Sequence, residues 1–218
     1  MTDLPMFPLG SVLFPYMPLQ LRVFEERYLV MLSRILVNEP AEFGVVLIER
    51  GQEVGGGEQR FPLGTVAQVT ELEATEEGFI GLVAQGDRRI EVVEWMPEDP
   101  HPRAVVRELD TLAWDDSLLP LLGRAERTVR STLALASEFT DQAWAANVEL
   151  SDDPVARAWQ LAGIAPLGTL DQVTLLRSST TEALLGSIIE LTVAAGESLR
   201  ASWPEEPLDL EEPLDPEG

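Results

Sequence analysis

The sequence contains no cysteine and no lysine, and each absence removes whole classes of chemistry. Without cysteine there is no disulfide, no thiolate metal site and no cysteine nucleophile. The sequence has 15 residues that are lysine or arginine, and all of them are arginine. A Walker-type phosphate loop, a serine–lysine dyad and a Schiff-base enzyme each require a lysine amine. The sequence therefore excludes these three kinds of active site.

Histidine and long apolar runs are also scarce. The single histidine, His101, lies between two prolines and is expected in a solvent-exposed loop rather than in a catalytic site. No run approaches about 18 uncharged apolar residues, the length that spans a membrane. Asp3 and the early prolines are unlike a signal peptide, whose start is cationic and whose next segment is apolar. These features predict a cytoplasmic protein with no membrane span.

Charge is strongly of one sign, with 38 acidic residues and a formal net charge of −23. Nucleic acids and anionic membranes are recognised by clustered cations, so neither is expected as a partner. Such acidity is typical of a solvated surface, and a basic partner is the alternative interpretation.

The polar motifs predict structure rather than catalysis. Asp115-Asp116 and Asp152-Asp153 precede helical patterns and are expected to cap helices instead of acting as acid–base pairs or metal ligands. Gly55-Gly56-Gly57 is expected to be a surface loop. Arg88-Arg89 is expected to form internal salt bridges, with the grip of a ligand carboxylate as the alternative. The sequence thus predicts no catalytic residue, no metal site and no cofactor.

The hydrophobic period changes along the chain. Residues 3–24 indicate two proline-containing strands at sheet edges or entries, and a helix opens at Glu25. Further strands follow up to about residue 112, and the helices come after it. The expected strands are 43–48, 65–74, 79–84, 88–95 and 103–109, with turns at 76–78 and 86–87, and the expected helices begin near Leu118, Asp153, Thr169 and Ser179. This order predicts an α+β fold.

Three units are expected: a β-rich unit at 1–112, a helical unit at 113–203 and an acidic, proline-rich tail at 204–218. The tail composition is typical of a disordered solubilising segment, and a short binding motif presented twice is the alternative.

The connection Phe14-Pro15-Tyr16-Met17-Pro18 is unusually apolar for a loop. Apolar residues in a loop are either tucked under the protein or offered to a partner. If they are offered, this segment and the next one supply the candidate peptide-binding residues, which are Phe14, Tyr16, Met17, Phe24 and Tyr28.

Several segments, taken in order over about residues 4–200, resemble the N-terminal substrate-binding domain of Lon-type ATP-dependent proteases. They are LPMFPLG, VLFP, PLQLRVFEERY, FGVVLI, LGTVAQV, LVAQGDRRIEV and LDQVTLL. Glu26 departs from the pattern, because the family often has proline there. The resemblance implies a twisted β-rich pseudo-barrel with one embedded helix, followed by a C-terminal helical bundle.

In the full proteases, this part helps to recognise unfolded substrates and to assemble the oligomer, and the ATPase and the Ser-Lys protease lie further along. Since the chain ends before either and has no lysine, we expect a non-catalytic module that binds unfolded polypeptide or a specific protein. An adaptor or self-associating regulatory protein for an ATP-dependent protease system is the alternative, so homo-oligomers are left open. A hydrolase would require a convergent polar pocket.

Overall fold

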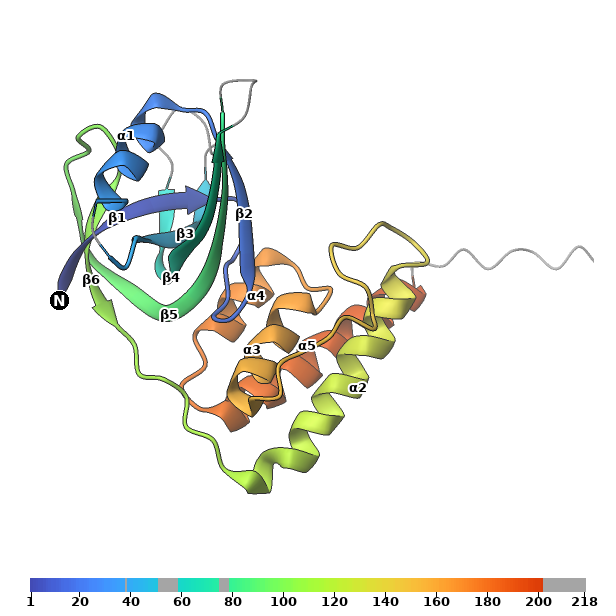
Figure 1. Ribbon diagram of the computed structural model, residues 1–218. Helices are drawn as coiled ribbons and strands as arrows, with labels where there is room; N and C mark the ends of the chain where they lie inside the picture. The colour runs from blue at the N-terminus through green and yellow to red at the C-terminus, as the bar shows by residue number, and fades with distance from the viewer. Residues whose placement is uncertain (38, 51–58, 75–78, 202–218) are drawn as a thin grey trace, which may run out of the picture.

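A computed structural model describes residues 1–37, 39–50, 59–74 and 79–201. The first half holds a six-stranded sheet and one helix, and the second half is helical (Figure 1). The strands are β1 (Thr2–Leu9), β2 (Pro18–Val23), β3 (Glu42–Arg50), β4 (Gln59–Ala74), β5 (Ile80–Met96) and β6 (Arg103–Glu108). The helices are α1 (Glu26–Ile35), α2 (Leu119–Ala136), α3 (Pro154–Ile164), α4 (Thr169–Leu176) and α5 (Thr181–Ala201). The loop expected at Gly55-Gly56-Gly57, the turn expected at 76–78 and the tail expected at 204–218 lie outside the described residues.

The sheet has the strand order β2-β5-β4-β3-β1-β6, and the long strand β5 also pairs with β6. Five strands thus curl round on themselves while β2 remains outside their ring of pairings. The β1–β3 pairing is parallel and the others are antiparallel. The expected mixture of helix and sheet is confirmed, but the sheet is not a regular barrel.

The two proline-containing strands occupy different places. β2 lies at the edge of the sheet, as Pro18 at its start suggests, whereas β1 lies between β3 and β6. Each half of β1, however, pairs on one side only: Thr2–Pro5 with β6 and Met6–Leu9 with β3. Pro5 and Pro8 therefore fit inside the sheet, because each half of the strand needs hydrogen bonds on one side only.

The turn expected at 86–87 is wrong, because β5 runs straight through it. Gly86 pairs with Ala67 inside the β4–β5 ladder. A Cβ at Gly86 would lie 2.1 Å from the carbonyl oxygen of Phe14. This glycine therefore permits a close backbone approach between two segments, which is a use of glycine that its sequence context did not distinguish from a turn.

Acidic residues begin two helical segments as expected. Asp153 accepts a hydrogen bond from the Ala156 backbone N–H at 2.7 Å, and Asp115 accepts one from the Ser117 N–H at 2.8 Å. Thr180 caps α5 by accepting from the Ala183 N–H. The helix α4 begins at Thr169 as expected, but Gly168 precedes it without a side-chain cap. None of the helices in the described part of the chain is long and apolar enough to cross a lipid bilayer.

One large hydrophobic cluster extends from the sheet through the helical half. Within the helical half, α2 contacts α3 and α5, and α5 also contacts α3 and α4. A smaller cluster around Met6, Val66 and Ile90 fills another part of the sheet. The shared cluster means that sheet and helices are held against each other by buried apolar surface, the main favourable term in folding.

Candidate functional site

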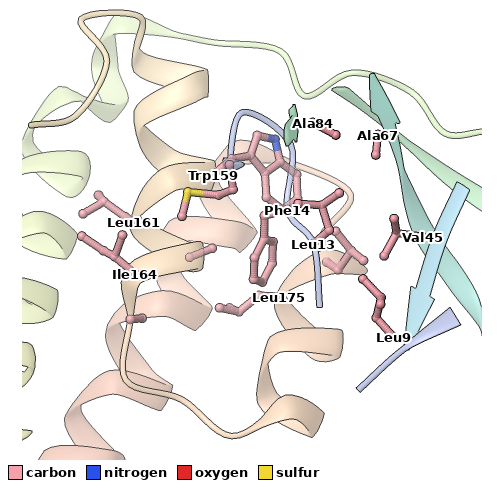
Figure 2. Packing of buried hydrophobic residues seen from close by; sticks show 14 of the residues in the cluster. Leu9, Leu13, Phe14, Val45, Ala67, Ala84, Trp159, Leu161, Ile164 and Leu175 are labelled. Atoms are coloured by element: carbon pink, nitrogen blue, oxygen red, sulfur yellow. The ribbon is translucent and has the colours of Figure 1, made fainter. Parts of the chain in front are cut away.

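The loop between β1 and β2 lies between the sheet and the helices. Phe14 is 1% exposed, and its ring centroid is 6.1 Å from that of Trp159 on α3 (Figure 2). The neighbours labelled in Figure 2 belong to the sheet side, namely Leu9, Val45, Ala67 and Ala84, and to the helical side, namely Leu161, Ile164 and Leu175. Of the two interpretations of this apolar loop, the structure supports the tucked-under one. We call this region the junction: residues 13–17, Gly86, Arg89 and Trp159.

Backbone hydrogen bonds fasten the loop to the sheet. The Tyr16 N–H donates to the Gly86 carbonyl at 2.7 Å, and the Gly86 N–H donates to the Met17 carbonyl at 2.9 Å. The Thr65 hydroxyl donates to the Leu13 carbonyl at 2.6 Å. Tyr16 has a φ of 63°, a left-handed conformation that such paired surroundings must hold in place.

The five candidate peptide-binding residues do not share one surface. Phe14, Met17 and Tyr28 are buried, and the Tyr28 ring stacks on Phe7 with 3.9 Å between centroids. Tyr16 is half-buried, and burial together with the Asp153 and Asp87 carboxylates raises the pKa of its phenol. Phe24 is 61% exposed. Only Phe24 and Tyr16 thus present part of their side chains for contact with a ligand.

Arg88 forms the internal salt bridges that the sequence predicts. Its guanidinium donates two hydrogen bonds to Glu42, at 2.8 and 2.9 Å, one to Glu108 at 2.7 Å and one to Asp87 at 2.8 Å. These acceptors raise the pKa of Arg88, chiefly through the bonds to Glu42. The network joins β3, β5 and the end of β6, so this guanidinium is already engaged by three carboxylates of the chain.

Arg89 behaves differently from its neighbour, because it is 6% exposed and has no carboxylate partner in the described part of the chain. It donates to three backbone carbonyls, those of Leu176 (2.9 Å), Ser178 (2.6 Å) and Asp110 (2.8 Å). The guanidinium carbon also lies 5.0 Å from the centre of the Trp159 ring. Burial lowers the pKa of Arg89. This residue, which sequence reasoning treated as half of a salt-bridging pair, ties β5 to the connection between α4 and α5.

His101 is 2% exposed, so the expectation of a solvated histidine is wrong. Its Nδ1 is 3.1 Å from the Pro102 carbonyl and its Nε2 is 3.4 Å from an Arg34 nitrogen. Burial is the first cause of a lowered pKa, so the neutral ring is favoured. The adjoining cavity of about 380 Å³ is lined by Asp3, Pro5, Arg34, Ile35, Pro40, Glu42 and Arg103 beside this ring. These residues include no serine, threonine or cysteine.

An open groove of about 870 Å³ lies over three strands of the sheet, away from the buried candidates Phe14, Met17 and Tyr28. We call it the β2–β5–β4 groove. Three consecutive residues from each strand line it: Gln20, Leu21 and Arg22 from β2, Gly81, Leu82 and Val83 from β5, and Glu71, Leu72 and Glu73 from β4.

Register explains the shape of the groove. Arg22, Gly81 and Glu73 are paired across the three strands, so their side-chain positions lie on one face. A Cβ added at Gly81 would meet nothing nearer than the Glu73 carbonyl oxygen at 3.6 Å. The middle strand thus contributes a residue with no side chain between two long charged ones. The face is therefore hollow at Gly81.

Apolar groups accompany the groove. Leu72 is 39% exposed at the projecting end of β4. The Arg22 guanidinium lies 4.0 Å from the centre of the Phe79 ring, just before β5. Val23, the last residue of β2, pairs with Ile80, the first residue of β5. Phe24 and Phe79, the residues next to this pair, therefore lie at the same end of the two strands. In the described part of the chain, β2 pairs with β5 alone, so no strand pairs with its other edge.

A second groove, of about 810 Å³, lies where the loop after α3 meets the ends of α2 and α5. Its lining includes Val12, Trp144 and Leu199 and contains no charged residue. In the described part of the chain, no group of three or more His, Asp or Glu residues could hold a metal ion.

Comparison with known proteins identifies the relatives of this chain. Residues 3–194 match the family described as the ATP-dependent protease La (LON) substrate-binding domain. The chain is 26% identical over 192 residues to Lon protease 2 of Herpetosiphon aurantiacus, which covers 84% of this chain and 23% of that protein. It is 29% identical over 107 residues to the Lon protease of Heliobacterium modesticaldum, covering 49% of this chain and 13% of that protein. The matched part of the chain thus spans less than a quarter of the length of these relatives.

Solved structures show the same fold. A Lon N-terminal domain protein from Xanthomonas campestris has a TM-score of 0.61 and 24% identity, and covers 87% of this chain and 98% of that one. The N-terminal domain of the Mycobacterium avium complex Lon protease has a TM-score of 0.63 and 15% identity, over 88% and 98% of the two chains. Since the family match extends over most of the sequence, this chain belongs to the family of ATP-dependent protease La (LON) substrate-binding domains.

Proposed function

We propose that this protein is a non-catalytic module that binds extended or unfolded polypeptide segments. The observation that carries the proposal is the family match over residues 3–194, because the family is named for substrate binding. The absence of lysine supports it, since the sequence cannot supply the base of a serine–lysine dyad.

The β2–β5–β4 groove, the outer edge of β2 and the exposed ring of Phe24 form the binding surface in this proposal. An extended peptide can pair its backbone with an open strand edge while its side chains enter neighbouring pockets. The sheet edge and the groove lie side by side, because β2 is the edge strand and its residues also form one wall of the groove. In the same proposal, residues 1–112 are the recognising unit, and the helices of residues 113–203 brace the sheet through the junction.

The test compares one polypeptide in two states. Hen lysozyme that has been reduced and carbamidomethylated is unfolded and basic, and disulfide-bonded lysozyme with the same sequence is folded. We expect the unfolded form to bind in a calorimetric titration, at low and at moderate salt, and the folded form to bind much more weakly. Equal heats for both forms would indicate charge attraction alone, and no heat with the unfolded form would contradict the proposal.

A further inference from the structure

We propose that the β2–β5–β4 groove selects extended segments in which lysine or arginine alternates with apolar residues. This inference rests on the proposed polypeptide-binding function and names the class of segment that the site takes.

The charges on one wall of the groove support a cationic ligand. Glu71 and Glu73 are exposed, lie two residues apart on β4 and therefore point to the same face. Neither carboxylate has an ion-pair partner in the described part of the chain. Arg22, on the opposite wall, has its guanidinium over the Phe79 ring. A cationic side chain in the groove would thus meet two available carboxylates on one side.

The floor of the groove supports an extended ligand with side chains at alternate positions. Gly81 leaves room between Arg22 and Glu73, and the next row on the same face is Gln20, Val83 and Glu71. A segment lying there finds a hollow at Gly81, the apolar side chain of Val83 beside it and acidic groups along the β4 wall. Alternation of cationic and apolar residues matches this arrangement.

The overall field favours the same ligands. With a net charge of −23, the protein attracts cationic segments from a distance, which speeds encounter and weakens with salt. The neutral lining of the second groove offers no comparable discrimination by charge.

The experiment uses fluorescein-labelled 12-residue peptides in which lysine, glutamine or glutamate alternates with valine and serine. Fluorescence anisotropy on the full chain is expected to show binding of the lysine peptide, weaker binding of the glutamine peptide and none of the glutamate peptide. Glu71→Gln with Glu73→Gln is expected to weaken the lysine peptide about three- to tenfold, since each partly exposed ion pair contributes little.

Two variants separate the groove from the general field. Glu94→Gln with Glu190→Gln removes the same number of charges from exposed positions outside the groove. This control is expected to change the affinity less than twofold at moderate salt. Gly81→Val places a branched side chain in the hollow and is expected to weaken all binding peptides by about tenfold or more, with circular dichroism verifying that the variant is folded.

Equal weakening by the two double variants would overturn the inference, as would unchanged affinity in Gly81→Val. Unfolded lysozyme distinguishes this failure from failure of the proposed function. If it binds the unaltered chain and all three variants equally, polypeptide binding stands and the groove assignment falls. If it does not bind the unaltered chain, the proposed function itself falls.

Discussion

The junction and the β2–β5–β4 groove contain similar residues, but the glycine and the arginine are buried in the junction and more exposed in the groove. Both contain a glycine of β5, an arginine stacked on an aromatic ring and nearby apolar side chains. In the junction, the Phe14 carbonyl occupies the space that a side chain at Gly86 would need. Arg89 is buried and donates hydrogen bonds to backbone carbonyls. In the groove, a Cβ at the glycine would meet nothing nearer than 3.6 Å, and the arginine is exposed.

This difference shows why residue type alone did not find the site. Apolar residues in a connection drew attention to the junction, yet burial there leaves little side chain for a ligand to contact. The groove consists of alternating residues on ordinary strands, and its hollow shape arises from the register that places Gly81 between longer side chains. Three predictions compare a buried residue of the junction with a more exposed residue elsewhere, and a fourth concerns the buried His101.

The largest expected effect comes from the same substitution at two phenylalanines. Phe14→Ala removes a ring packed on Trp159 and should lower the free energy of unfolding by about 3–5 kcal/mol. Phe24→Ala removes an exposed ring and should change it by less than about 0.5 kcal/mol. Urea denaturation monitored by circular dichroism measures both. Similar losses for the two variants would show that the junction is not the tighter region.

Two glycines of the same strand give the second test. A Cβ at Gly86 would lie 2.1 Å from a backbone oxygen, so Gly86→Ala should destabilise the fold by about 3 kcal/mol. At Gly81 the nearest atom is 3.6 Å away, so Gly81→Ala should be neutral or stabilising by up to about 1 kcal/mol. Thermal unfolding of the pair is the measurement, and a neutral Gly86→Ala would mean that the loop and strand are not in close contact.

Two arginines give the third test. Arg89→Gln leaves buried carbonyls without their donors and should lower the free energy of unfolding by about 2 kcal/mol. Arg107→Gln removes an exposed ion pair with Glu91 and should cost less than about 1 kcal/mol. Chemical denaturation at 0.1 and 0.5 M salt compares them. An Arg89 effect that vanishes at high salt would contradict a buried anchor.

The smallest expected effect is the dependence of stability on pH through His101. Its folded-state pKa is lowered by burial, so the unfolded chain binds more protons, and stability falls as pH drops below about 6.5 towards the folded-state pKa. The stability advantage of the unaltered chain over His101→Asn should therefore be larger at pH 8 than at pH 5.5. A difference that does not change with pH would mean that the ring titrates alike in both states.

Much of the fold follows from the sequence. Periodicity predicted the helices to within a few residues, and the capping roles of Asp115 and Asp153 are confirmed. The interruption expected in β5 is wrong, because the use of Gly86 depends on a loop distant in sequence. Arg89 and His101 were misjudged for the same reason, since burial is set by tertiary packing. The candidate groove depends on strand register, which no local pattern specifies.

The most direct test is NMR mapping of the amides that respond when the lysine-containing peptide is added to the full chain. If the groove binds the peptide, chemical-shift changes are expected at residues 20–22, 71–73 and 81–83, with little change at residues 13–17 of the junction. Changes confined to the junction, with the groove amides unmoved, would contradict binding in the groove.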